Sequence, residues 1–401
     1  MLILLALILA VHFCLPGQAA PPPGYDSLRL YTEALFEIAQ KYVWPKSEEE
    51  MIYGSLRGMM NSLDPDSSFL TPKEYQDYLR GQKGQTAEAG VELILKDNLL
   101  TAVSVLDNGP AGRAGLLAGD HILKIDGQPV RNLTTQEAAH RFTGASGTPV
   151  KVQVIRNGQV KPLDLTIKLE PLASTTVSSK FLGDSIAYVR VSYFNDGTGE
   201  EFARAVNLIK KHRPPIQGVV LDLRNNARGE LPQAVQTAAV LLGDQQIART
   251  KGRAPDSEVS YKGKDRDRIL KKTLPLIVLV DQGTARAAEI VAGALRDQFQ
   301  AKLLGAKTLG LCGLTKAMPL QDGSALIMTV ALCYTPHGQK IQGKGLDPEI
   351  TGKTLALTKP PAKGAPRPEV LSPDQDPWVQ QALEVLKPEK GRRVAQATKS
   401  Q

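Results

Sequence analysis

Hydrophobic and polar positions follow two different periods along this chain, and the change of period divides it into regions. In residues 25–80 the apolar side chains recur every three or four positions, which predicts a small helical region. In residues 86–170 short runs alternate in polarity, and Gly or Pro interrupts them about every ten positions. This second pattern predicts a compact β-rich module.

From residue 185 onward the pattern predicts strands and helices in alternation. The expected strands are residues 186–191, 218–223, 274–280 and 301–304, and the expected helices are residues 200–210, 231–242 and 287–296. Such alternation is typical of an α/β core with parallel strands, which we assign to residues 171–357. A β-hairpin is expected within it, with strands at 314–320 and 325–334 and a turn at Asp322-Gly323.

The two ends of the chain differ from the middle. Residues 1–15 are apolar apart from His12, and small residues and then prolines follow, which predicts a signal peptide or N-terminal anchor over residues 1–20. We therefore expect export to the periplasm or another extracytoplasmic compartment, with membrane association through the N-terminus if the segment is retained. Residues 358–373 read as a Pro-rich linker, 374–387 as an amphipathic helix and 388–401 as a disordered tail.

Charge and composition exclude several classes of partner. Lysine and arginine number 49 against 41 aspartates and glutamates, for a net charge of +8. The densest basic stretch, residues 262–272, contains Asp265 and Asp267, so a solvated loop is favoured over a nucleic-acid interface. We expect no nucleic acid, no metal ion and no cofactor.

Several separate motifs along the chain resemble those of one protein family, and they occur in the same order as in that family. They are S-L-D-P-D-S-S-F-L at 62–70, P-A-G-R-A-G-L-L-A-G-D-H-I-L-K-I-D-G at 110–127, G-V-V-L-D-L-R-N-N at 218–226, Y-T-P-H-G at 334–338 and I-Q-G-K-G at 341–345. Together they resemble the carboxyl-terminal processing serine peptidases, also called tail-specific proteases. The resemblance implies a multi-domain α/β protein with an N-terminal helical region, an inserted β-rich PDZ module and a peptidase-like core with parallel strands and a β-hairpin.

The resemblance also implies a binding site for protein C-terminal tails. In PDZ modules a peptide adds as a strand beside an edge strand, and backbone N–H groups of a glycine-containing loop hold its carboxylate. The candidate loop here consists of Ala89, Gly90, Val91, Glu92 and Leu93, and residues 134–142 would form the helix beside the groove. A folded PDZ module that no longer binds peptide is the alternative.

The catalytic positions of the family are replaced in this chain. The family uses a serine nucleophile and a lysine base, and a buried lysine can act as a base because burial lowers its pKa. The matching positions here are Arg286 for the nucleophile, Leu311 for the base, Thr315 for the glutamine that orients it, and Ala227, Arg228 and Gly229 in the oxyanion loop. Because loss of a nucleophile or base removes most of the rate, we expect no peptidase activity by the family mechanism.

Two questions about these replacements stay open at this point. Thr284, Lys307 or Cys312 could supply a substitute nucleophile, with His337 as the one conceivable partner for a thiol. Arg286 and Arg228 should face the same pocket, since their segments surround the reacting carbonyl in the family. They could bind a carboxylate or other anion there, or they could pair with a local acid such as Glu289 or Glu230.

The hairpin predicts a disulfide. If Asp322-Gly323 form a two-residue turn, Gln321 faces Ser324, and counting outward places Cys312 opposite Cys333. The pair would occupy a non-hydrogen-bonded site, where the Cα atoms lie about 4.5 Å apart, within disulfide range.

The expected function is therefore binding without cutting. We expect an exported pseudopeptidase that holds C-terminal tails and acts as a scaffold or regulator, with an active relative as one candidate partner. An active endopeptidase with an unrecognised nucleophile is one alternative. A purely structural envelope protein, with terminal helices that form a homodimer, is the other.

Overall fold

The computed structural model describes residues 25–82, 86–96, 99–131, 133–264, 268–270, 273–353 and 372–387. The chain divides into two compact units, Met1–Gly58 and Met59–Gln401. The predicted signal segment, the predicted disordered tail and most of the Pro-rich linker lie outside the described residues.

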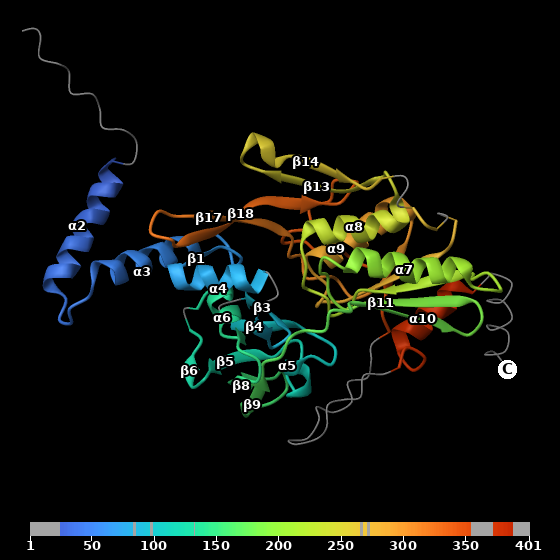
Figure 1. Cartoon of the computed structure of the whole chain (residues 1–401), viewed down its shortest axis with the longest axis horizontal. Coiled ribbons are helices and arrows are strands. Elements are labelled where there is room, and N and C mark those ends of the chain that lie inside the picture. The colour runs from blue at the N-terminus through green and yellow to red at the C-terminus, as the bar shows by residue number, and fades with distance from the viewer. Residues whose placement is uncertain are drawn as a thin grey trace, which may run out of the picture. The chain divides into compact units, whose positions relative to one another are not determined.

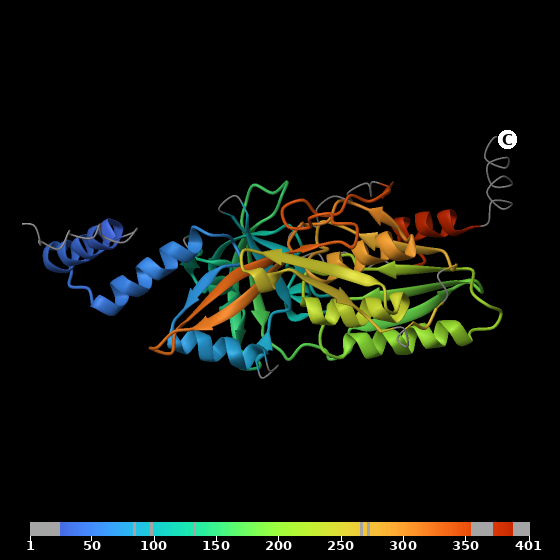
Figure 2. The same cartoon turned by 90° about the horizontal axis from the view of Figure 1, so that it is seen from above.

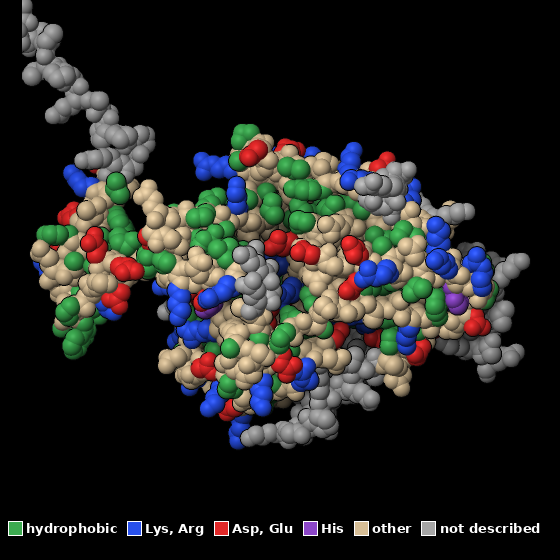
Figure 3. Space-filling view, viewed as in Figure 1, with side chains coloured by type: hydrophobic (Ala, Val, Ile, Leu, Met, Phe, Trp, Pro, Cys, Tyr) green, Lys and Arg blue, Asp and Glu red, His purple; other side chains and the backbone are tan. Residues whose placement is uncertain are grey.

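The first unit contains helix α2 (Tyr25–Lys41) and most of α3 (Glu48–Asn61), as the helical spacing predicted. A hydrogen bond of 2.6 Å between the hydroxyls of Tyr31 and Ser55 joins the two helices. Several large apolar side chains of α2 stay more than half exposed, and they appear as green patches on the N-terminal helices in Figure 3. Within the described part of the chain, no helix is long and apolar enough to cross a membrane.

In the second unit the end of α3 and strand β1 (Ser68–Leu70) precede α4 and the β-rich module. The elements are α4 (Pro72–Gln82), β2 (Ala87–Glu88), β3 (Val91–Lys96), β4 (Leu99–Val105), α5 (Pro110–Arg113), β5 (His121–Ile125), β6 (Gln128–Pro129), α6 (Thr135–His140), β7 (Thr143–Gly144), β8 (Pro149–Ile155) and β9 (Leu163–Lys168). One sheet runs in the order β3-β4-β5-β8-β9. Alternate residues of β8 are buried, because one face of this sheet packs on the core of the module.

A six-stranded sheet forms the centre of the α/β core. Its order is β10 (Val177–Leu182), β11 (Ile186–Val191), β12 (Gly218–Asp222), β15 (Leu276–Val280), β16 (Lys302–Gly305) and β19 (Ile350–Thr351). The last five strands are parallel, and β10 is antiparallel to β11. The sequence interpretation predicted β11, β12, β15 and β16 and missed β10 and β19.

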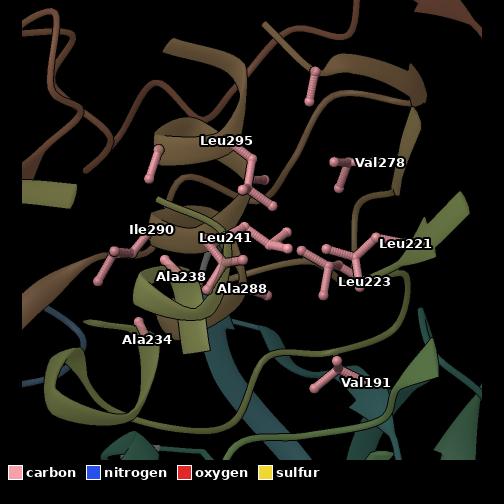
Figure 4. Packing of buried hydrophobic residues seen from close by; sticks show 14 of the residues in the cluster. Val191, Leu221, Leu223, Ala234, Ala238, Leu241, Val278, Ala288, Ile290 and Leu295 are labelled. Atoms are coloured by element: carbon pink, nitrogen blue, oxygen red, sulfur yellow. The ribbon is translucent and has the colours of Figure 1, made fainter. Parts of the chain in front are cut away.

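Helices cover both faces of this sheet (Figures 1 and 2). The helices α7 (Thr198–Lys211), α8 (Leu231–Leu242) and α9 (Ala287–Phe299) pack on one face, and α10 (Pro377–Leu386) packs on the other. Strand β12 is buried along its whole length, so Leu221 points to α7–α9 while Val220 points to α10. Figure 4 shows Leu221 and Val278 among the side chains of α8 and α9.

A second core sheet is antiparallel and is organised around β18 (Ala325–Tyr334). This strand pairs with β1 (Ser68–Leu70), β13 (Gln246–Gly252) and β17 (Gly313–Pro319), and β14 (Val259–Lys262) pairs with β13. A 3₁₀ turn, η1 (Pro255–Ser257), connects β13 and β14. The hairpin β17–β18 was predicted, whereas β1, β13 and β14 were not. Lys262, assigned to a solvated loop, ends β14.

The turn of this hairpin differs from the prediction. The Leu320 N–H donates to the Ser324 carbonyl at 2.8 Å, so these residues close the turn and the predicted facing of Gln321 and Ser324 is wrong. The resulting shift of one position is undone farther along, because the pairing is irregular between Leu314 and Thr315. The extra residue in the turn and the irregular pairing shift the register in opposite directions, so the predicted pairing of Cys312 with Cys333 is restored.

A disulfide joins Cys312 and Cys333. Their Cα atoms lie 5.5 Å apart, and the Cys333 N–H donates to the Cys312 carbonyl at 3.0 Å. The predicted non-hydrogen-bonded site with the shorter Cα separation is therefore wrong. The bond fixes the segment ahead of β17 to the far end of β18.

Loss of this disulfide should lower stability. We expect the double variant Cys312→Ala, Cys333→Ala to lose about 3 kcal/mol in free energy of unfolding, because the closed loop of moderate length no longer restricts the unfolded chain. Denaturant titration with and without a reductant measures this. The reductant should reproduce the loss in the wild type and leave the variant unchanged; a wild type indifferent to reductant would contradict the expectation.

Candidate functional site

Three loops meet at the carboxyl edge of the parallel sheet, around the turn from β15 into α9. Arg286 is the N-terminal cap residue of α9 and has φ 53° and ψ −119°, a conformation that a residue with a side chain seldom adopts. Its N–H donates to the Leu311 carbonyl at 2.9 Å, and the Ala285 N–H donates to the Asn226 carbonyl at 2.9 Å. The loops after β12 and β16 therefore hold this turn in its strained form.

The Arg286 side chain forms an ion pair with an acid distant in sequence. Its Nη2 lies 2.8 Å from Asp66 Oδ1; the Arg286 side chain is 25% exposed and that of Asp66 4%. Burial alone would lower the pKa of Arg286, but the charges of Asp66 and Glu92 raise it above its ordinary value. The predicted pairing with Glu289 or Glu230 is wrong, because the partner is Asp66 of the D-P-D-S-S motif.

Arg228 is held by two acids of the PDZ module. Its guanidinium binds the Glu88 carboxylate, with Nη2 3.0 Å from Oε1, and lies 3.9 Å from Glu92. Burial raises the pKa of Glu92, while the charges of Arg228 and Arg286 both lower it, so Glu92 is within electrostatic reach of both arginines. We call Asp66, Glu88, Glu92, Arg228 and Arg286 the acid–arginine cluster. The carboxylates that Arg228 and Arg286 contact are therefore side chains of this protein.

Leu311 lies in an apolar seam between the PDZ module and the core. It is 8% exposed and packs in one cluster with Ile94 and Val103 of the module and Ala227 and Ala285 of the core. The structure thus brings together the positions of Arg286, Leu311 and Ala227. Thr315 is not part of this cluster.

Thr315 lies instead in β17, opposite Thr329 of β18 and directly after the irregularity in their pairing. Its side chain is half-buried. The sequence order of the loop could not show this, because the position of Thr315 depends on the hairpin register.

The oxyanion-loop positions have structural roles. Gly229 has φ 118°, and a Cβ built on it would lie 2.3 Å from Phe194 Cβ, so only glycine fits. The Arg228 carbonyl accepts the Phe194 N–H at 3.1 Å. Ala227 is 1% exposed. The loop is held closely against the segment that follows β11.

Asn225 links the same loop to the PDZ module, which the sequence did not reveal. Its side chain accepts the Val105 N–H at 2.9 Å and donates to the Val105 carbonyl at 2.6 Å. The Ser104 hydroxyl donates to the Asn225 carbonyl at 2.9 Å. Asn225 has φ 48°. The N-N pair of the motif was visible, but its partner strand β4 is about a hundred residues away and could only be found in the fold.

The proposed substitute nucleophiles are engaged elsewhere. Cys312 is in the disulfide. The Thr284 hydroxyl is fully buried and donates to the Leu223 carbonyl at 2.9 Å. Lys307 is 57% exposed and pairs with Asp347, and His337 is 68% exposed beside Asp297. The structure does not bring these side chains together into a nucleophile and base.

Glu289, one turn into α9, fixes the loop that carries Leu311. Its carboxylate accepts the N–H groups of Gly310 at 2.8 Å and Leu311 at 2.9 Å, and the Thr308 hydroxyl. The side chain is fully buried, and this burial raises the pKa of Glu289 to about 7 in spite of those hydrogen bonds.

The candidate tail loop lies beside α6, as predicted. The Ala89 N–H donates to the Phe142 carbonyl at 3.0 Å, and Gly90 has φ 71°. Helix α6 is shorter than predicted. The Thr135 hydroxyl on α6 accepts the Leu95 N–H of β3 at 3.2 Å, so this donor of the strand is already engaged across the groove. Residues Val91, Glu92 and Leu93 of the predicted loop are the start of β3. Of the acid–arginine cluster, Glu88 precedes the loop and Glu92 belongs to it. Among the residues the structure describes, no group of His, Cys, Asp and Glu could hold a metal ion.

Comparison with known proteins agrees with this architecture. The family model for peptidase family S41 matches residues 185–351, and that for the PDZ domain matches residues 87–168. The carboxy-terminal-processing protease of Bartonella bacilliformis is 35% identical over 328 residues, which cover 81% of this chain and 75% of that protein. The chain belongs to peptidase family S41.

Other members of the family are also similar. Carboxy-terminal processing protease CtpA of Bacillus subtilis is 28% identical over 359 residues, which cover 89% of this chain and 76% of that protein. The solved structure of a photosystem II D1 C-terminal processing protease matches with a TM-score of 0.67 and 25% identity, over 80% of this chain and 92% of that one. The resemblance inferred from the sequence motifs is confirmed, and so is the PDZ domain.

The buried Glu289 should make stability depend on pH. Its folded-state pKa of about 7 lies above its ordinary value of 4.5, so the folded protein binds a proton more tightly than the unfolded chain. The stabilisation is present below about pH 4.5 and is lost as pH rises through about 7. We expect the wild type to lose about 2.5 kcal/mol relative to Glu289→Gln between pH 5 and pH 8.

Urea unfolding of both proteins across this pH range measures the difference. Glu200→Gln, at a side chain 84% exposed, is the matched control and should follow the wild type at every pH. A difference between wild type and Glu289→Gln that stays constant or grows in favour of the wild type with rising pH would refute the assignment.

Proposed function

We propose that this S41 family member binds the C-terminal tails of other proteins through its PDZ domain and does not cleave them. The observation that carries the proposal is Arg286, which occupies the strained turn and is paired with Asp66. Covalent peptide hydrolysis requires a nucleophile within hydrogen-bond reach of a base. A guanidinium paired with a carboxylate cannot attack a carbonyl, and the neighbouring Leu311 cannot accept a proton.

The seam beside Arg286 supports the same proposal. Ile94 and Val103 of the PDZ domain pack against Leu311 and Ala285. A scissile peptide would have to displace these side chains to reach the turn. The acid–arginine cluster lies beside these side chains. The region where the family would cleave a peptide is therefore filled by contacts between the PDZ domain and the core, and the PDZ groove is the surface that we propose for binding.

Compartment and assembly belong to the same proposal. A disulfide persists in oxidising compartments, which favours an exported protein with an N-terminal segment that is cleaved or retained at the membrane. On α2, Leu28, Leu30, Phe36 and Ile38 are 51–68% exposed, and an apolar surface of this kind suits contact with a second copy. A dimer that presents two PDZ domains would suit a scaffold or regulator of an active relative.

Tail capture can be tested with a pool of labelled peptides that end in a free carboxylate and the same pool amidated at the C-terminus. We expect the carboxylate pool to bind about tenfold or more tightly, because the loop N–H groups hydrogen-bond a charged acceptor. Gly90→Ala should abolish the preference, since a Cβ there would lie 3.3 Å from Leu106 and Leu172 at φ +71°. Gly127→Ala, with φ +78° and no atom within 4 Å of its Cβ, is the matched control and should retain it.

Mass spectrometry of the same incubations tests the second half of the proposal. We expect no fragments over a period in which an active S41 peptidase digests an unfolded substrate completely. If repurified protein still produces substrate fragments and a variant with one side chain changed does not, that side chain is a working nucleophile and the proposal is overturned. Equal binding of carboxylate and amide pools would overturn tail capture and favour a structural role.

A further inference from the structure

A cavity lies at the carboxyl ends of β11, β12 and β15. Its volume is about 570 Å³, and its walls include the loop after β4, the segment ahead of β10 and the N-terminal end of α10. Small-molecule and side-chain pockets commonly measure about 300–1,000 Å³, and α/β proteins bind ligands at this edge of the sheet. The cavity shares no residue with the acid–arginine cluster.

Both arginines in the wall of the cavity are already engaged. Arg190 lies 2.8 Å from Asp107 and donates to the Arg224 carbonyl at 2.5 Å. Arg224 lies 2.6 Å from Asp222 and 2.9 Å from Asp376. Because the charges of Arg224 and Arg190 outweigh burial, the pKa of Asp222 is held far below its usual range, so these pairs stay charged. An anionic ligand would have to break them.

Carboxylates are in excess among the described residues of the wall. Four aspartates face two arginines, which leaves an excess of two negative charges. Asp281 forms no ion pair with a described residue. Its Oδ1 accepts the N–H groups of Asn225 at 2.8 Å and Gly283 at 2.9 Å and the Thr284 hydroxyl at 3.2 Å, while Oδ2 accepts no hydrogen bond from a described residue. In Asp107, Oδ2 binds Arg190, and Oδ1 accepts no hydrogen bond from a residue that the structure describes.

We infer that this cavity binds a guanidinium or ammonium group, the side chain of an arginine or lysine in a bound peptide, through Asp281 and Asp107. Burial raises the pKa of Asp281, although the charges of Arg224 and Arg190 lower it, so a further cation beside Oδ2 would stabilise the charged carboxylate. A peptide is the favoured source because the cavity borders the PDZ domain: Leu106, next to Asp107, donates its N–H to the Gly90 carbonyl at 2.9 Å.

The site can be tested on the full chain with N-acetyl-arginine amide, which carries the charge and no carboxylate. N-acetyl-citrulline amide, of nearly the same shape but neutral, is the matched ligand. Calorimetric titration should give saturable binding of the arginine compound, weakened by salt, with citrulline about tenfold or more weaker. Because the probe has no carboxylate, this outcome is independent of tail capture by the PDZ loop.

Two variants locate the site. Asp281→Asn and Asp107→Asn keep their acceptor oxygens and should each weaken binding about five- to tenfold. Asp184→Asn, at an exposed carboxylate in the β10–β11 turn, is the control and should bind as the wild type. If circular dichroism shows that Asp281→Asn disturbs the fold, Asp107→Asn carries the test.

Three results would overturn the inference: equal affinity for arginine and citrulline compounds, no saturable binding at millimolar concentration, or unchanged affinity in Asp107→Asn. Spermidine serves as a further arm. If it binds far more tightly than N-acetyl-arginine amide and displaces it, the cavity takes a free amine, and the assignment to a peptide side chain is wrong.

Discussion

The contact between Arg286 and Asp66 determines what the rest of this structure can do. A cation at the N-terminal end of a helix is disfavoured by the helix dipole, and a buried charge without a partner is costly. Asp66 supplies the compensating charge from a segment more than two hundred residues earlier, at 2.8 Å. The strained turn from β15 into α9 is thereby held by a fixed ion pair.

Further contacts beside Arg286 join the loops of the core to the PDZ domain. Leu311 extends an apolar patch to the PDZ domain, Arg228 binds Glu88, and Asn225 holds the edge of β4 through both polar groups of Val105. Each of these contacts joins a loop at the carboxyl edge of the sheet to the PDZ domain. Ion pairs alone would be weak support, but here they lie beside buried apolar side chains and directional hydrogen bonds.

Much of the fold could be predicted because its signals are local. The bounds of β11 and α8 follow from unbroken apolar runs and helical spacing, and the family motifs directed attention to Arg286 and Leu311. The partners could not be predicted. Nothing in the spacing relates Asp66 to Arg286 or Glu88 to Arg228. Strands β13 and β14 alternate too little in polarity to be recognised before β13 pairs with β18 and β14 pairs with β13. The hairpin turn was misread because its extra residue is compensated by an irregular pairing near Thr315.

A double-mutant cycle on Arg286 and Asp66 tests the central claim most directly, that the turn is a closed structural pair. Stability would be measured by denaturant titration for Arg286→Met, Asp66→Asn and both together. We expect each single change to cost about 3–5 kcal/mol, because it leaves the other charge buried without a partner. The double variant should recover about 2 kcal/mol or more of the summed loss. Additive effects, with no recovery, would contradict the account and leave Arg286 free to act on a ligand.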